Sequence, residues 1–211
     1  MKPRQPRPVS STGAKRTTRK RLLPEERREQ LVRFGVAAAA EKGLGRLVHA
    51  DVAAAAGVST PTAFLYFRDR EALLRAVIAE VDRFNREIAR RAHDPAVPPL
   101  ERVRRHLLTF ADSIETDRAY AVVWLEWTTM FRNEYGLWDA FVDFQEHIIS
   151  RLEKSIRRCQ ADGSVPSQVS AADSARLITA GAYALTQLKI MKRRKNVAER
   201  FAEHILAQAL T

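Results

Sequence analysis

The stretch HADVAAAAGVSTPTAFLYFRDR, from His49 to Arg70, decides the fold of this chain. Its first residues, rich in alanine and valine, repeat their apolar positions at helical spacing up to Gly57. Glycine there can end a helix in the left-handed conformation, which it adopts at low cost. Ser59 can cap a new helix with its hydroxyl, and Pro61 suits the first turn of that helix. The stretch therefore predicts two short helices joined by a tight turn.

The second helix begins at about Thr60 and should have two different faces. The inward face carries small and aromatic side chains, namely Ala63, Phe64 and Phe67. The outward face carries hydroxyl, apolar and acidic side chains, namely Thr62, Leu65, Tyr66 and Asp69. Two such helices are typical of a helix-turn-helix, which places its second helix in a DNA major groove. An ordinary helical hairpin also needs a glycine turn and a cap, and it is the alternative.

The helix-turn-helix hypothesis gives a set of candidate DNA-binding residues. Their hydroxyls and cations would contact phosphates or base edges, and Leu65 would read DNA shape or a thymine methyl group. The set comprises Arg19, Lys20, Arg21, Arg46, His49, Ser59, Thr60, Thr62, Leu65, Tyr66, Arg68 and Arg70.

Positive charge is concentrated at the N-terminus. The chain has 211 residues and a net charge of +11, of which +8 falls in residues 1–23, where there is no acidic residue. Proline, serine and basic residues dominate this segment, so we expect a disordered basic arm. Such an arm can follow the DNA backbone or enter a minor groove, or it can act only as a solubilising tail. If the arm dominated, the protein would bind nucleic acid with little sequence preference.

We expect the whole chain to divide into four segments, of which all but the N-terminal arm are helical. The basic arm, residues 1–23, precedes a helix-turn-helix domain at 24–69, a connecting helix at 70–92 and a ligand-binding and dimerisation domain at 93–211. The DNA-binding domain starts with a helix from Pro24 to about Lys42. Within the last domain we expect helices at about 100–115, 118–132, 136–162, 171–193 and 197–209. The fold class is therefore all-α, with an N-terminal head and a C-terminal bundle.

Aromatic residues cluster in the middle of the C-terminal domain. They predict a pocket for a small hydrophobic ligand between bundle helices, although a plain aromatic core fits the spacing equally well. Glu126 lies between two tryptophans and can orient a polar ligand or pair with an arginine. The candidate pocket residues are Phe110, Tyr120, Trp124, Trp127, Phe131, Trp138 and Phe144.

The last two helices carry apolar stripes with small residues between them. They predict a two-fold interface, because a homodimer matches a palindromic operator; closure of the bundle within one chain is the alternative. The candidate interface residues are Leu177, Ile178, Gly181, Leu185, Leu188, Phe201 and Ile205.

Several function classes find no support in the sequence. Cys159 is the only cysteine, and no apolar run is long enough for a membrane span, so we expect a cytoplasmic protein. The chain has no nucleophile elbow, phosphate-binding glycine loop or cluster of metal ligands. We therefore expect no enzyme activity, no cofactor and no metal.

The order of residues resembles the DNA-binding signature of the TetR family. The matching features are AGVS at Ala56–Ser59, the aromatic pair Tyr66-Phe67 and the charged link at Arg68–Glu71. Further stretches are similar to the HapR/SmcR/LuxR-type master regulators of quorum sensing, among them Gly43–Arg46 and Val123–Trp127. The resemblance implies an all-α homodimer with two heads on one operator, a basic arm that reaches DNA, and a hydrophobic pocket. It also implies a bacterial protein associated with the nucleoid.

The recognition helix departs from the HapR-type pattern at two positions. Leu65 stands where those proteins have asparagine between two aromatic residues, and a leucine side chain cannot hydrogen-bond to a base edge. Pro61 is also unexpected there. The departures predict a different operator sequence. The resemblance leaves open whether the protein activates or represses transcription.

Overall fold

The computed structural model describes residues 22–130, 136–191 and 195–211, and throughout these residues the regular structure is helical. This confirms the all-α prediction. The helices are α1 (Pro24–Lys42), the short 3-10 helix η1 (Leu44–Arg46), α2 (His49–Ala56), α3 (Thr60–Tyr66), α4 (Arg70–Ala92), α5 (Pro99–Thr116), α6 (Arg118–Met130), α7 (Leu137–Ala161), α8 (Ala171–Ile190) and α9 (Lys195–Leu210).

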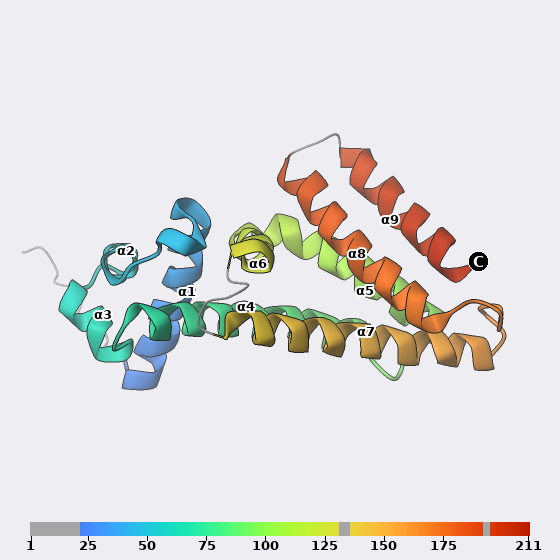
Figure 1. Cartoon of the computed structure of the whole chain (residues 1–211), viewed down its shortest axis with the longest axis horizontal. Coiled ribbons are helices and arrows are strands. Elements are labelled where there is room, and N and C mark those ends of the chain that lie inside the picture. The colour runs from blue at the N-terminus through green and yellow to red at the C-terminus, as the bar shows by residue number, and fades with distance from the viewer. Residues whose placement is uncertain (1–21, 131–135, 192–194) are drawn as a thin grey trace, which may run out of the picture.

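The helices form a head and an elongated body (Figure 1). Helices α1, α2 and α3 gather at one end, and α4 leads from them along the body beside α7. Helices α8 and α9 pack against each other in the body, and the C-terminus lies far from the head. Helix α4 thus runs from the head into the body, and the expected division of the chain into domains stays a prediction.

Local sequence signals define the ends of the head helices. Gly57 adopts φ 64° and ψ 39° after α2, the left-handed conformation expected at a helix end. The Ser59 hydroxyl caps α3 by accepting a hydrogen bond from the Thr62 amide at 3.3 Å. Asp69 caps α4 by accepting from the Ala72 amide at 2.7 Å, and this bond is the main cause of the lowered pKa of its carboxyl group.

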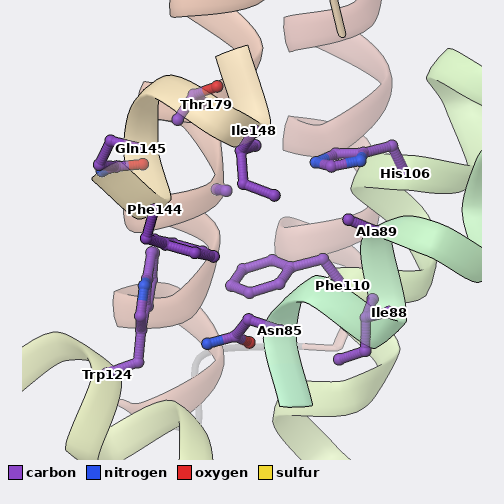
Figure 2. A pocket seen from close by; sticks show the side chains of 11 residues that line it. Asn85, Ile88, Ala89, His106, Phe110, Trp124, Phe144, Gln145, Ile148 and Thr179 are labelled. Carbon is purple, nitrogen blue, oxygen red and sulfur yellow. The ribbon is translucent and has the colours of Figure 1, made fainter. Parts of the chain in front are cut away.

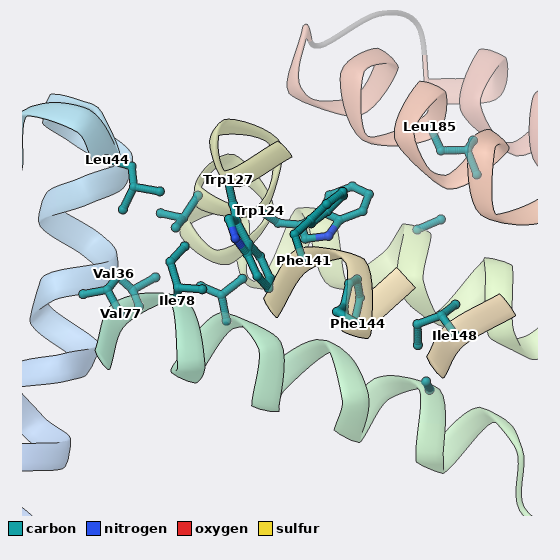
Figure 3. Packing of buried hydrophobic residues seen from close by; sticks show 14 of the residues in the cluster. Val36, Leu44, Val77, Ile78, Trp124, Trp127, Phe141, Phe144, Ile148 and Leu185 are labelled. Carbon is teal, nitrogen blue, oxygen red and sulfur yellow. The ribbon is translucent and has the colours of Figure 1, made fainter. Parts of the chain in front are cut away.

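One hydrophobic core runs from the head into the body. Figure 3 shows it passing from Val36 and Leu44 in the head, past Val77 of α4, to Trp127 of α6. At Gly35 a Cβ atom would lie 2.8 Å from a Val77 methyl group, so glycine permits the close approach of α1 and α4. The first turns of α4 thus belong to the packing of the head, although the expected division placed its boundary at residue 70.

None of the helices in the described ranges is both long enough and apolar enough to span a bilayer.

Candidate nucleic-acid interface and ligand pocket

Helix α3 is held from one side and exposed on the other. Ala63 and Phe67 are 0% and 1% exposed and attach the helix to the head core. Leu65 is 84% exposed, which agrees with its expected place on the outward face. Phe64 was expected in the core but is 49% exposed, since Ala63 and Phe67 already fill the inner side of this seven-residue helix.

His49 positions α3 from within the head. Its ring is 4% exposed and stacks on Phe64 with 3.8 Å between ring centroids. Its Nε2 lies at hydrogen-bond distance, 2.7 Å, from the carbonyl oxygen of Phe67. The imidazole thus joins the start of α2 to the end of α3, and the expected phosphate contact does not fit this buried placement.

The hydroxyls at the start of α3 are arranged before any DNA arrives. The Ser59 and Thr62 hydroxyl oxygens lie 2.8 Å apart and share a hydrogen bond. Ser59 is exposed, while Thr60 and Thr62 are partly exposed. Tyr66 is partly buried against the head core, so only part of its ring can reach DNA. The contacts expected of these four residues remain predictions.

Two of the candidate arginines lie on the surface of the head. Arg46 is exposed and donates from Nε to the Lys42 carbonyl at 2.7 Å. Arg68 has an 88% exposed side chain that forms an ion pair with Asp69 at 2.8 Å. Exposed pairs of this kind contribute little stability and can exchange for a phosphate contact. The arm residues Arg19, Lys20 and Arg21 lie outside the described residues.

Arg70, another candidate DNA-binding residue, hydrogen-bonds to the backbone of the head. Its Nε donates to the Leu47 carbonyl at 3.0 Å, and its Nη2 donates to the Gly45 carbonyl. The half-buried guanidinium therefore ties the start of α4 to the loop before α2. A phosphate contact does not fit this geometry, because the fork of donors already faces the protein.

Glu126 connects the body to the head. Its Oε2 accepts a hydrogen bond from the Leu44 amide in η1. The carboxylate therefore faces the head, whereas the sequence favoured a ligand or an arginine as its partner. Since Trp124 lies two residues earlier on the same helix, α6 contacts both the head and the centre of the body.

The body contains a small apolar cavity of about 30 Å³ (Figure 2). Three of the predicted pocket residues line it: Phe110, Trp124 and Phe144. The other lining residues come from α4, α5, α7 and α8: Asn85, Ile88, Ala89, His106, Gln145, Ile148, Thr179 and Ala182.

The remaining predicted pocket residues lie elsewhere. The Tyr120 hydroxyl donates to Glu80 at 3.0 Å, and burial raises the pKa of Tyr120 to about 12. Trp127 is fully buried and donates from Nε1 to the Leu137 carbonyl at 2.8 Å. Trp138 packs against another aromatic ring of α7, Phe141, outside the cavity lining. Phe131 lies outside the described residues.

Polar atoms in the cavity lining lack partners. Asn85 Nδ2, Trp124 Nε1 and Gln145 Oε1 are buried without a hydrogen bond among the described residues. In Figure 2 the Asn85 amide points toward Trp124. Asn85 and Gln145 were not among the predicted pocket residues. Asn85 was detectable as a polar residue between Val81 and Ile88 on the apolar face of α4.

Four candidate interface residues are buried within the chain instead. Ile178 and Leu185 are 0% exposed, and Ile205 is 5% exposed. A Cβ atom at Gly181 would lie 2.4 Å from Ile205 Cδ1, so the small residue serves the packing of α8 on α9. This is the intramolecular alternative. Leu177, Leu188 and Phe201 retain exposed surface and stay candidates for a dimer contact; Leu177 is 43% exposed.

An exposed, capped second helix on a three-helix head, carried by a helical body, defines the helix-turn-helix class of DNA-binding proteins. Residues 32–77 of the chain match the family model described as "Bacterial regulatory proteins, tetR family". It is 33% identical over 124 residues to the HTH-type transcriptional regulator LuxR of Vibrio harveyi, which bears out the resemblance to the LuxR type. That alignment covers 59% of this chain and only 60% of LuxR.

Solved structures show the same fold. A TetR-family transcriptional regulator from Rhodococcus sp. has a TM-score of 0.71 at 23% identity, over 89% of this chain and all of that one. FadR from Bacillus subtilis, solved in complex with stearoyl-CoA, has a TM-score of 0.70 at 14% identity, over 87% of this chain and 97% of that one. The family and the LuxR relative are described as regulators, in agreement with the prediction that the chain is not an enzyme.

Proposed function

We propose that this protein is a homodimeric transcriptional regulator that binds a pseudo-palindromic operator through α3 of each copy. The observation that carries the proposal is the 84% exposure of Leu65 on a helix whose opposite side is fully buried. Such a helix offers an apolar and hydroxyl-bearing surface to a major groove. Two copies would place their α3 helices roughly 34–36 Å apart on successive turns of DNA.

The proposed dimer contact uses the outer surfaces of α8 and α9. The apolar residues with exposed surface are Leu177, Leu188, Met191, Val197 and Phe201. Leu177 and Leu188 lie three turns apart on the same side of α8, and Met191 directly follows that helix. A second copy of the chain is the occupant that a two-fold operator requires.

Selection of bound sequences from a random DNA pool tests the operator proposal. The full-length protein should enrich an inverted repeat at near-physiological salt, and a Leu65→Ala variant should lose enrichment at the positions that Leu65 contacts. An Arg157→Gln variant, changed at an exposed site on α7, is the matched control and should enrich the same repeat. If unrelated DNA competes equally, the protein binds nucleic acid through charge alone, and the operator proposal is wrong.

The basic arm has its own test within the same proposal. Removing residues 1–23 should weaken DNA binding and flatten its salt dependence, because each lost phosphate contact removes about 0.9 from the log–log slope. An unchanged slope would exclude phosphate contacts by the arm.

We also infer that a small, mainly hydrophobic ligand binds the cavity and changes operator affinity. The three unpartnered polar atoms support this, since buried polar groups are normally hydrogen-bonded. At about 30 Å³ the cavity must widen around a ligand, and the Phe110 and Phe144 rings are among the side chains that line it. Regulation of quorum-sensing genes, implied by the LuxR-type resemblance, belongs to this proposal.

Two helices can transmit a change in the cavity to the head. Asn85 lies on α4, which begins at the loop-binding Arg70, and Trp124 lies on α6, which carries the contact from Glu126 to Leu44. A ligand shifts operator affinity only as far as it favours one placement of the head over another.

A ligand screen with an operator-binding readout tests the regulatory proposal. A ligand that changes operator affinity should lose its effect in Asn85→Leu, which removes the unpartnered amide. Tyr120→Phe is the control, because Tyr120 lies outside the cavity lining. An effect that persists in Asn85→Leu would place the ligand elsewhere.

A further inference from the structure

A second cavity in the body, here called the basic pocket, has an unusual lining. It measures about 210 Å³ and lies where the end of α4 meets α5 and α7. Its lining consists only of arginine, lysine, histidine and serine side chains: His93, Arg102, His147, Ser150, Arg151, Lys154, Ser155 and Arg158. A cavity with this lining repels cations and attracts anions.

Among the described residues, three cations of the basic pocket have no ion-pair partner, although several exposed arginines nearby do. On α7, Arg157 pairs with Glu153 at 2.7 Å, and on α4 Arg86 pairs with Asp82 at the same distance. By contrast, within the described part of the chain no carboxylate forms an ion pair with Arg151, Lys154 or Arg158. The lining therefore carries a net positive charge, although the Asp82 carboxylate acts on His147 at its edge.

Arg151 also carries an unused donor. Its Nε is buried and has no hydrogen-bond partner in the described structure, while its Nη2 lies 3.4 Å from His147 Nε2. A buried charged donor without an acceptor is costly, so the site is suited to an acceptor that comes from outside the chain.

The side chains at the floor of the basic pocket are buried and hydrogen-bonded. Arg102 is 8% exposed and donates to the carbonyls of Val97 and Pro95, each at 2.6 Å. His93 is also 8% exposed; its Nδ1 lies 2.9 Å from the Ser155 hydroxyl and its Nε2 lies 3.0 Å from His106 Nδ1. These contacts set the positions of the donors before an anion binds.

The pKa of the His93 imidazole reflects the positive charges around it. Burial, followed by the positive charges of Arg151, Arg102 and Arg158, lowers the pKa of His93 to about 4. The groups that face His93 are therefore three cations, a hydroxyl and a neutral imidazole, with no carboxylate among its close partners. A bound anion would offset the cations and raise this pKa, which gives a direct spectroscopic readout.

We propose that the basic pocket binds the phosphate groups of a small molecule. Three unpaired cations and an unused guanidinium donor suit the several acceptor oxygens of a phosphate or diphosphate. The cavity volume exceeds several-fold the space that one water needs, so it can hold more than a single ordered water. The site is independent of the DNA-binding surface, and its failure would leave the proposed operator binding untouched.

The phosphate can come from two sources. One is a free phosphorylated metabolite. The other is the head of an amphipathic molecule whose apolar part enters the apolar cavity, because His93 lines the basic pocket, His106 lines the apolar cavity, and the two rings touch. The shared chemistry is the phosphate, and the experiment below separates the two sources.

Titration of the full-length protein with sodium pyrophosphate at constant ionic strength tests the site. We expect saturable binding by calorimetry, and a rise in the His93 pKa followed by NMR of its ring protons. Arg151→Gln should weaken binding by about 10- to 100-fold, the effect of losing one hydrogen bond to a charged group. Lys154→Gln, at an exposed position, should also weaken binding and guards against a folding defect in the first variant.

The matched control is Arg157→Gln, which removes the same charge from an exposed position on the same helix. It should change the dissociation constant by less than twofold. Absence of saturable binding would overturn the proposal. Equal weakening by Arg157→Gln and Arg151→Gln would also overturn it, since this would show only a general effect of net charge.

Coenzyme A and stearoyl-CoA then distinguish the sources. If stearoyl-CoA binds more tightly than coenzyme A and Asn85→Leu removes only that difference, the ligand is amphipathic and spans both cavities. If pyrophosphate, coenzyme A and stearoyl-CoA bind equally, the basic pocket recognises the phosphates alone. Both results support the phosphate site, whereas loss of all three in Asn85→Leu contradicts a separate site.

Discussion

Replacing Arg70 with lysine separates two explanations of this residue. Arg70 donates to the carbonyls of Leu47 and Gly45, and a lysine ammonium lacks the fork that reaches both. Loss of one hydrogen bond from a charged donor costs about 1.5–3 kcal/mol. For a chain of this size that corresponds to a fall in melting temperature on the order of 4–10 °C. We therefore expect Arg70→Lys to be clearly less stable and to bind operator more weakly.

The salt dependence of operator binding decides between the explanations. If Arg70 supports the head from within, the log–log slope stays unchanged in Arg70→Lys and also in Arg70→Gln. If it contacts phosphate, Arg70→Gln lowers the slope by about 0.9 per copy, or about 1.8 for a dimer. Arg68→Gln is the control with the opposite expectation, since Arg68 is exposed beside α3 and its loss should lower the slope without lowering stability. If Arg70→Gln lowers the log–log slope of operator binding but leaves the melting temperature unchanged, the structural explanation is wrong.

Three further results follow from the buried groups of the body. The pKa of His93 is lowered to about 4 and that of His106 to about 3, so below pH 6.5 the unfolded chain binds more protons than the folded chain. The free energy of unfolding should therefore fall between pH 7 and pH 5, by about 2 kcal/mol for His93. A free energy of unfolding that does not change with pH would contradict this. Gly181→Ala should destabilise the packing of α8 on α9, although alanine has the better helix propensity, because the new Cβ would clash with Ile205 Cδ1. Ile205→Val removes that methyl group, so denaturation of the double variant should show a favourable coupling of about 1 kcal/mol. Strictly additive effects of the two substitutions would show that Gly181 does not pack against Ile205. Burial raises the pKa of the Cys159 thiol. A disulfide reagent should therefore modify this thiol far more slowly in the native protein than in denaturant. Equal rates of modification would show that the thiol is accessible in the folded protein.

Local signals predicted the helices well because those signals act over a few residues. The Gly57 turn, the Ser59 cap and the Asp69 cap all appear where the sequence placed them. The five expected body helices match α5 to α9 to within a few residues over the described ranges. Hydrophobic periodicity and capping need no knowledge of distant partners, so they can be read from the chain alone.

The candidate site was harder to predict, because partners of a side chain come from distant segments. His49 and Arg70 have the chemistry of phosphate ligands, yet each faces a backbone carbonyl in the folded head. Trp124 lines the apolar cavity while Trp127, three residues later, satisfies its donor inside the core. Sequence spacing places both tryptophans on one helix but does not say which gap between helices each one meets.

By itself, the sequence determined the helical class, the helix-turn-helix with its outward Leu65, and the concentration of charge in the first 23 residues. Only the tertiary structure decided which polar groups lack partners. Asn85 and Arg151 lie on different helices, and nothing in their neighbouring residues shows that each keeps a buried donor unused. The physical reason is that hydrogen-bond satisfaction depends on every element packed around an atom, whereas helix formation depends mainly on the residues next to it in the chain.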